Sequence, residues 1–276
     1  MRVSLGRRIL DVFDDRMDPR LIAGLGSIAL SVRSRSRCTV RYEQGNWVHR
    51  YPAGIVVSTT LSGLTAQMED QVAQDTFLYG YRPRPGDTVV DIGAGVGTEV
   101  RLFSRLVGDT GRVVSIEAHP RTFRCLHRTV ELNALTNVTL LECAVVGEAG
   151  PVYLEDDAVD HLRNGLTSEA AGGVEVTGRR LDEVMAAAGI DRIDLLKMNI
   201  EGAELGVLAG SGDALDAVDN LVVSCHDFKA AGPTDAWMCT FAGVTDLLTE
   251  AGYRITTRPD DPRPWIPYYV YASRRG

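Results

Sequence analysis

Short apolar runs alternate with helical segments from residue 84 to the end of the chain, and this alternation restricts the fold. Buried strands are predicted over five runs, 88–92, 113–116, 138–141, 193–198 and 221–225. Between them, Thr98–Val107 and Thr122–Leu132 carry apolar residues at helical spacing. Strands that alternate with helices predict an α/β fold whose parallel sheet has helices on both faces. The loops that follow the strands then meet at one edge, where ligands bind.

The first 65 residues depart from this pattern. Leu5–Phe13 and Leu21–Val32 are predicted to be helical, whereas Thr39–Tyr42 and Trp47–Tyr51 alternate like the two strands of a hairpin. The chain therefore divides into an N-terminal extension, 1–65, and a main domain, 66–276.

Composition excludes several classes of protein. The chain has 276 residues and a net charge of -8, although ten arginines and five acidic residues give residues 1–50 a charge of +5. An acidic main domain does not favour nucleic acid as a partner. Five widely spaced cysteines without a CxxC pair indicate reduced thiols. No apolar run approaches the length of about 20 residues that spans a bilayer. We therefore expect a cytoplasmic protein with no membrane partner.

A glycine-rich turn, GAGVG at 93–97, follows the first predicted strand. Glycine lets a ligand approach the backbone, and the helix after it offers free N–H groups. A dinucleotide site needs G-x-G-x-x-G, but the last position is Thr98 counted from Gly93 and Val100 counted from Gly95. Asp91, before the first glycine, would repel a pyrophosphate and suit a cation. The turn thus predicts S-adenosylmethionine, which has a sulfonium and no phosphate, rather than a nicotinamide dinucleotide.

A second acid, Glu117, ends the next predicted strand, 26 residues after Asp91. A carboxylate in this place can accept hydrogen bonds from both hydroxyls of a ribose. The alternative is a tight turn that carries two surface acids.

Several stretches resemble class I S-adenosylmethionine-dependent methyltransferases of the FkbM type. They are VVDIGAGVG (89–97), VSIEAHP (114–120), LNALTNVTLLECAV (132–145), RLDEV (180–184) and DLLKMNIEGAELGVL (194–208), of which the last is the most specific. The resemblance implies a Rossmann-like sheet of seven strands whose last hairpin is antiparallel, which fits the runs at 253–257 and 268–272. It also implies O-methylation of a hydroxyl on a small molecule, such as a sugar, polyketide or other natural product, and S-adenosylhomocysteine as product. N-methylation, carboxyl methylation and a non-catalytic relative that only binds the cofactor are the alternatives.

The same resemblance implies a set of cofactor contacts. The turn with Asp91 is expected to hold the methionine end, and Glu117 the ribose. The whole set comprises Asp91, Gly93, Gly95, Gly97, Glu117, Ala118, His119, Cys143, Ala144 and Asn199.

Candidate catalytic residues follow the strands at 193–198 and 221–225. His226 is expected to be the base that a weakly nucleophilic alcohol needs, and its alternative is a strand-end histidine bonded to a neighbour. Asp227 is expected to orient His226 or to begin the next loop. Asn199 is expected to donate to the acceptor oxygen or to the methionine end, and Glu201 to bind the cofactor or orient the base.

The acceptor end departs from the family pattern. The family usually has Asp at the position of Asn199 and Glu near Ser224, and both changes remove negative charge. With few carboxylates left there, no bound metal is predicted. Lys197 lies inside a buried strand, where a charge needs a partner, and Glu201 is the partner expected.

Three further expectations concern other segments. The polar segment 156–174, with His161, is predicted to be a lid or a flexible loop. Trp237 and Phe241 share a helical face with Val244 and Leu248 and are expected to be core residues. The extension is expected to form an acceptor wall or the contact of a homodimer.

Overall fold

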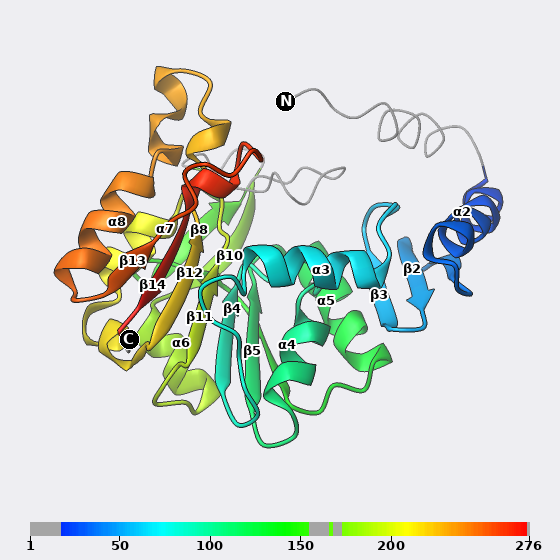
Figure 1. Ribbon diagram of the computed structural model, residues 1–276, viewed down its shortest axis with the longest axis horizontal. Coiled ribbons are helices and arrows are strands. Elements are labelled where there is room, and N and C mark those ends of the chain that lie inside the picture. Colours follow the sequence, from blue (N-terminus) through cyan, green and yellow to red (C-terminus); the bar gives the residue numbers. More distant parts are fainter. Residues whose placement is uncertain (1–17, 155–165, 168–172, 275–276) are drawn as a thin grey trace.

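The computed structural model describes residues 18–154, 166–167 and 173–274 (Figure 1). Its centre is a seven-stranded sheet in the order β13-β14-β12-β11-β4-β5-β6. Only β14 runs antiparallel to its neighbours in this sheet, which confirms the predicted class I methyltransferase arrangement with its antiparallel last hairpin. The strands are β4 (Thr88–Ile92), β5 (Arg112–Glu117), β6 (Val138–Glu142), β11 (Leu195–Met198), β12 (Asn220–Ser224), β13 (Arg254–Thr256) and β14 (Tyr269–Ser273).

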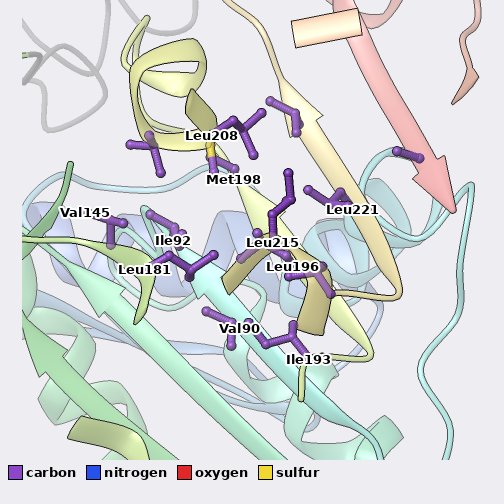
Figure 2. Close-up of a cluster of buried hydrophobic side chains, with 14 of the residues drawn as sticks. Val90, Ile92, Val145, Leu181, Ile193, Leu196, Met198, Leu208, Leu215 and Leu221 are labelled. Carbon is purple, nitrogen blue, oxygen red and sulfur yellow. The ribbon is translucent and has the colours of Figure 1, made fainter. Parts of the chain in front are cut away.

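Helices cover both faces of this sheet (Figure 1). One face packs against α3 (Ala66–Thr76), α4 (Val100–Val107) and α5 (Pro120–Leu132). The other packs against α6 (Leu181–Ala188), α7 (Glu204–Gly210) and α8 (Phe241–Glu250), through the apolar cluster of Figure 2. Short 3₁₀ turns complete the main domain: η2 (Gly212–Ala217), η3 (Asp227–Lys229), η4 (Pro233–Met238) and η5 (Ile266–Tyr268).

Trp237 does not belong to the helical face predicted for it. It lies in η4, before α8 begins at Phe241, and its side chain is 49% exposed. Val244 and Leu248 are buried core residues as expected. The prediction was wrong for Trp237 because a turn at Cys239 and Thr240 separates the two segments.

A second, small sheet lies after β6, in the order β7-β10-β8-β9. It consists of β7 (Ala144–Val145), β8 (Gly150–Leu154), β9 (Leu166–Thr167) and β10 (Val174–Arg179). Only a short strand at 152–154 was predicted. β9 falls within the segment predicted as a lid; the rest of that segment between 155 and 172, with His161, lies outside the described residues.

The N-terminal extension contains α2 (Pro19–Ser34) and a three-stranded sheet of β1 (Thr39–Glu43), β2 (Asn46–Tyr51) and β3 (Gly54–Ser58). Gln44 and Gly45 both have positive φ, as a tight hairpin turn requires, so the predicted hairpin is confirmed. β3 was not predicted from the sequence. The helix predicted at 5–13 lies outside the described residues.

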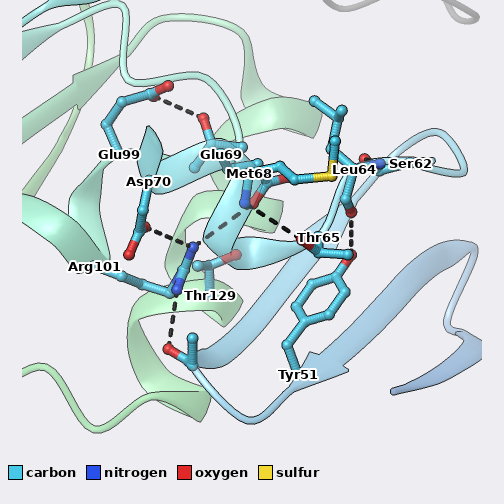
Figure 3. A network of polar contacts seen from close by, with 12 residues as sticks. Tyr51, Ser62, Leu64, Thr65, Met68, Glu69, Asp70, Glu99, Arg101 and Thr129 are labelled. Atoms are coloured by element: carbon cyan, nitrogen blue, oxygen red, sulfur yellow. Dashed lines mark hydrogen bonds and ion pairs between the residues drawn. The ribbon is translucent and has the colours of Figure 1, made fainter. Parts of the chain in front are cut away.

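A buried arginine joins this extension to the main domain (Figure 3). Arg101 of α4 is 4% exposed; it donates to the carbonyl of Ala53 at 3.1 Å and lies 3.4 Å and 3.6 Å from carboxylate oxygens of Asp70 and Glu69. Burial raises the pKa of Glu69 to about 8, although Arg101 opposes that shift. The turn between β2 and β3 is thereby fixed to α3 and α4.

Backbone groups along the outer edge of β3 are hydrogen-bonded to a side chain of α5 and to one directly after it. Thr129 Oγ1 accepts from Val57 N at 3.0 Å, and Asn133 both accepts from Ile55 N at 2.9 Å and donates to its carbonyl at 2.7 Å. An edge strand satisfied in this way cannot pair with another chain there. The domain division at residue 65 stays a prediction.

Candidate active site

A cleft of about 100 Å³ opens at the carboxyl ends of β4, β5 and β11. Seven of the ten predicted cofactor residues line it: Gly93, Gly95, Glu117, Ala118, Cys143, Ala144 and Asn199. Six other residues that line the cleft were not predicted from the sequence: Ile92, Ile116, Val145, Leu154, Ile200 and Ala203. A larger hollow of about 640 Å³, around Thr88, Arg112 and Asp194, lies at the amino ends of the strands and contains none of the predicted site residues.

The three glycines of the turn have positive φ, and at two of them a neighbouring residue leaves no room for a side chain. Gly93, Gly95 and Gly97 have φ values of 74°, 58° and 86°. A Cβ on Gly93 would lie 2.2 Å from the carbonyl oxygen of Asn199, whereas one on Gly95 would meet nothing within 4 Å. A Cβ on Gly97 would lie 2.8 Å from Leu126 of α5. Gly97 therefore serves the packing of α5 and does not line the cleft.

Glu117 is anchored by two backbone N–H groups. Its Oε2 accepts from Gly95 N at 2.9 Å and its Oε1 from His119 N at 2.8 Å. Burial raises the pKa of Glu117, and these two hydrogen bonds oppose that shift. Each oxygen keeps a further lone pair. The carboxylate can therefore accept from two adjacent hydroxyls in the cleft.

Asp91 lies behind the cleft and not in its wall. It is fully buried, and its Oδ1 is 2.8 Å from Lys197 Nζ, which also donates to the carbonyl of Gly93 at 2.8 Å. The expected pair of Lys197 with Glu201 is wrong, because the parallel register of β11 and β4 sets Lys197 beside Asp91. Asp91 thus supports the glycine turn through Lys197. His119 is 5% exposed and also lies outside the cleft wall.

Three ionisable side chains meet beside the cleft. His226 is 2% exposed; its Nδ1 is 2.7 Å from Glu204 Oε1 and its Nε2 is 3.3 Å from Glu201 Oε1. Glu204 is fully buried and its other oxygen accepts from Thr240 Oγ1 at 3.0 Å. Glu201 lines the cleft, and its second oxygen pairs with Lys229.

This geometry does not fit the base role expected for His226. Burial disfavours its charged form, but the hydrogen bonds and charges of Glu201 and Glu204 outweigh burial and raise the pKa of His226 to about 9. At neutral pH the ring is therefore protonated on both nitrogens. Burial also opposes ionisation of Glu201, yet His226 and Lys229 outweigh it and lower the pKa of Glu201. Of these side chains, Glu201 is the one that reaches the cleft.

Glu204, which the sequence analysis did not single out, takes the place expected for Asp227. The carboxylate of Asp227 instead accepts from Thr240 N and Phe241 N, both at 3.1 Å, at the start of α8. The signal for Glu204 was present, since Glu204 is the last residue of the Lys-x-x-x-Glu-Gly-x-Glu pattern that begins at Lys197. Within the described ranges no three His, Cys, Asp or Glu side chains group as metal ligands.

The turn after β11 is strained and carries an aromatic neighbour. Glu201 has a φ of 55°, in the left-handed region that costs a non-glycine residue about 1 kcal/mol. Gly202 follows with a φ of 98°, and a Cβ there would lie 2.7 Å from the indole ring of Trp237. The half-exposed ring of Trp237 therefore packs on the turn that positions Glu201.

Comparison with known proteins identifies the family. Residues 91–255 match the family described as the methyltransferase FkbM domain. The chain belongs to the FkbM methyltransferase family. The 31-O-demethyl-FK506 methyltransferase FkbM of Streptomyces tacrolimicus is 27% identical over 260 residues, 82% of this chain and 96% of that protein. Methyltransferase 1 of Beauveria bassiana is 25% identical over 221 residues, 71% of this chain and 85% of that protein.

Two further similarities are weaker. The 2-O-methyltransferase NoeI of Sinorhizobium fredii is 28% identical over 150 residues, 48% of this chain and 60% of that protein. A crystal structure of a methyltransferase FkbM from Methylobacillus flagellatus has a TM-score of 0.45 at 19% identity, covering 69% of this chain and 48% of that one.

S-adenosylmethionine is the methyl donor of this FkbM-type methyltransferase. The residues fit that cofactor. The open space at Gly95 leaves room for a ligand against the backbone, and the anchored carboxylate of Glu117 offers two acceptors for a pair of hydroxyls. Among the described residues of the turn, none offers a cationic side chain that could bind a phosphate. The nearby Lys197 is already paired with Asp91 and donates to the carbonyl of Gly93.

Proposed function

We propose that this methyltransferase transfers the methyl group to a hydroxyl of a small molecule, such as a sugar, a polyketide or another natural product. The observation that carries the proposal is the carboxylate of Glu201. It lines the cleft next to Asn199 and is held between the buried cation of His226 and Lys229. A hydroxyl must lose its proton during methylation, and a fixed carboxylate beside it can accept that proton.

In this proposal the carboxyl ends of β4, β5 and β6 hold the cofactor. Glu117 accepts from the ribose hydroxyls, and Cys143 and Ala144 lie beside the adenine. The backbone of Gly93 and Gly95, supported by Asp91 through Lys197, holds the methionine end. When bound, S-adenosylmethionine supplies a methyl group on a positively charged sulfur.

The acceptor then lies between Asn199 and Glu201. Asn199 donates to the acceptor oxygen or to the methionine end, and Glu201 orients the hydroxyl and takes its proton as the oxygen–carbon bond forms. His226 and Glu204 position Glu201. Alignment of the reacting groups supplies much of the rate gain in such a reaction, and the base adds roughly 10²–10⁴-fold.

The names of two relatives support oxygen as the acceptor atom, since they describe a 31-O-demethyl-FK506 methyltransferase and a 2-O-methyltransferase. Both are distant, so the acceptor itself is to be found by experiment. N-methylation and carboxyl methylation are the outcomes that would replace this proposal.

The test is a methylation assay with S-adenosylmethionine labelled in its methyl group. The acceptors are matched sets of sugars, macrolactones, amines and carboxylic acids, and each product is located by mass spectrometry and NMR. The expected label is on a hydroxyl oxygen, with activity reduced at least 100-fold in Glu201→Gln and unchanged in the exposed control Glu142→Gln. Label on nitrogen or on a carboxyl group, or cofactor binding without transfer to any acceptor, would overturn the proposal.

The pH profile tests the choice of base. If Glu201 accepts the proton, kcat is level between about pH 6.5 and 8, because its lowered pKa keeps it ionised throughout. A rate that climbs with pH towards the pKa of His226, about 9, would return the base role to that histidine.

A further inference from the structure

Helix α2 exposes an apolar stripe on a protruding part of the molecule. Leu21, Leu25, Ile28 and Val32 are 61%, 60%, 65% and 74% exposed. Their spacing of four, three and four residues sets them along one side of the helix. Figure 1 shows α2 at the outer end of the molecule, beyond β2 and β3. Exposed apolar side chains that form a contiguous stripe mark an interaction surface.

The opposite side of α2 packs against the three-stranded sheet of the extension. Ile22, Ala23 and Leu30 are buried in the cluster that the helix shares with β1, β2 and β3. The helix is thus apolar on two sides, of which the described residues cover only one. The stripe is therefore not needed to hold α2 on the extension.

The surface around the stripe is basic. Four arginines, all exposed, lie in α2 or directly after it: Arg20, Arg33, Arg35 and Arg37. The helix itself contains no acidic residue, and Asp18 is engaged as its N-cap. This face therefore favours an anionic partner, although the whole chain has a net charge of -8.

A second copy of the chain fits this face poorly. A symmetric contact through α2 would bring the arginines of the two copies together, and like charges oppose association. The stripe from Leu21 to Val32 is only about 16 Å long at 1.5 Å per residue. A single convex helix of this length offers little area for a stable dimer. A bilayer surface needs no groove and supplies negative charge along the whole helix.

We infer that α2 is a membrane-surface helix that lies in the interface of a bilayer rich in anionic lipids. The stripe enters the boundary between headgroups and acyl chains, and the flanking arginines contact lipid phosphates. None of the helices in the described part of the chain meets the length and hydropathy that a bilayer crossing requires. The inference replaces our sequence-based expectation of no membrane partner, and it does not depend on the proposed function.

The test is sedimentation of the full chain with vesicles. Vesicles of phosphatidylcholine alone are compared with vesicles that contain an equal share of phosphatidylglycerol, at low salt and at high salt. We expect binding only to the anionic vesicles, weakened at least tenfold by high salt. The double variant Leu25→Glu, Ile28→Glu should lose at least tenfold in vesicle affinity while its Tm and methyltransferase activity stay unchanged.

Two further sets of variants test whether the stripe and the arginines bind the vesicles. Val72→Glu alters an apolar residue on α3 that is 51% exposed, and this variant should bind vesicles like the wild type. Arg33→Glu with Arg35→Glu should weaken binding, and the corresponding lysine variants should restore it. The inference is overturned if the anionic vesicles do not bind, or if the stripe variant binds as well as the wild type. A dimer in sedimentation velocity that the stripe variant abolishes, without vesicle binding by the wild type, would assign the stripe to a second copy.

Discussion

The two halves of the cleft are built in different ways. On the cofactor side, most polar contacts come from backbone groups and from Glu117, within the 29 residues from Asp91 to His119, and Lys197 of β11 supports them from outside that stretch. On the acceptor side, Glu201, Glu204, His226 and Thr240 come from three separate segments that meet only in the folded chain. The cofactor side is therefore rigid and local, whereas the acceptor side depends on how β11, β12 and α8 pack.

The buried charged groups also differ between the cofactor side and the acceptor side of the cleft. Lys197 and Asp91 form a buried pair with 1% and 0% side-chain exposure, and Lys197 also donates to the carbonyl of Gly93 in the turn. The chain of Glu204, His226, Glu201 and Lys229 runs from a fully buried carboxylate to a partly exposed amine. The acceptor-side chain thus reaches the cleft through Glu201, whereas the pair of Lys197 and Asp91 lies behind it.

The largest effect is expected from breaking the cofactor-side pair. Lys197→Met leaves the buried Asp91 without its partner, and the free energy of unfolding should fall by roughly 3–5 kcal/mol. Urea denaturation measures this loss. The double variant Lys197→Met, Asp91→Asn removes both charges and should recover most of it. A single variant as stable as the wild type would show that Asp91 finds another partner.

The acceptor-side chain should make stability depend on pH. The pKa of His226 is raised from 6.5 to about 9, so its stabilisation is complete below about pH 6.5 and is lost as the pH rises through 9. Relative to His226→Asn, the wild type should lose roughly 3 kcal/mol of unfolding free energy over that range. Thermal unfolding at successive pH values tests this. If the unfolding free energies of the wild type and of His226→Asn changed with pH in parallel, His226 would not be held as a cation.

Cofactor affinity should depend on one carboxylate. Glu117→Gln keeps the shape of the side chain and removes the charge that accepts from two hydroxyls, so the Kd for S-adenosylmethionine should rise about 10- to 100-fold. Isothermal titration measures it. Glu142→Gln, at the paired position in β6 and exposed, is the matched control. If both variants lost the same affinity for S-adenosylmethionine, the loss would come from removing a negative charge and not from the position of Glu117.

The smallest effect concerns the aromatic neighbour of the acceptor side. Trp237 is half exposed and packs on Gly202, beside Glu201. In Trp237→Ala the KM for the acceptor should rise several-fold, about 1 kcal/mol, with little change in kcat, because the ring adds contact area and no chemistry. Steady-state kinetics with the acceptor varied separate the two constants. A fall in kcat alone would mean that Trp237 acts by holding Glu201.

Local sequence was sufficient for much of the fold and for one half of the site. β4 matches its predicted bounds, and Gly93, Gly95 and Glu117 line the cleft as expected. These features depend on short patterns, namely apolar runs, positive-φ glycines and an acid at a strand end. Prediction failed where a contact joins distant segments, as in the pairing of Lys197 with Asp91 or of His226 with Glu204.

By itself, the sequence determined the α/β sheet, the glycine turn and the kind of cofactor, because periodicity and backbone conformation are properties of neighbouring residues. Only the tertiary structure decided which charges are paired. The register of β11 against β4 selected the partner of Lys197, and the packing of α7 against β12 selected Glu204 for His226. Pairing in turn sets the pKa of each group, so the change of the expected base from His226 to Glu201 followed from the fold and not from either residue type.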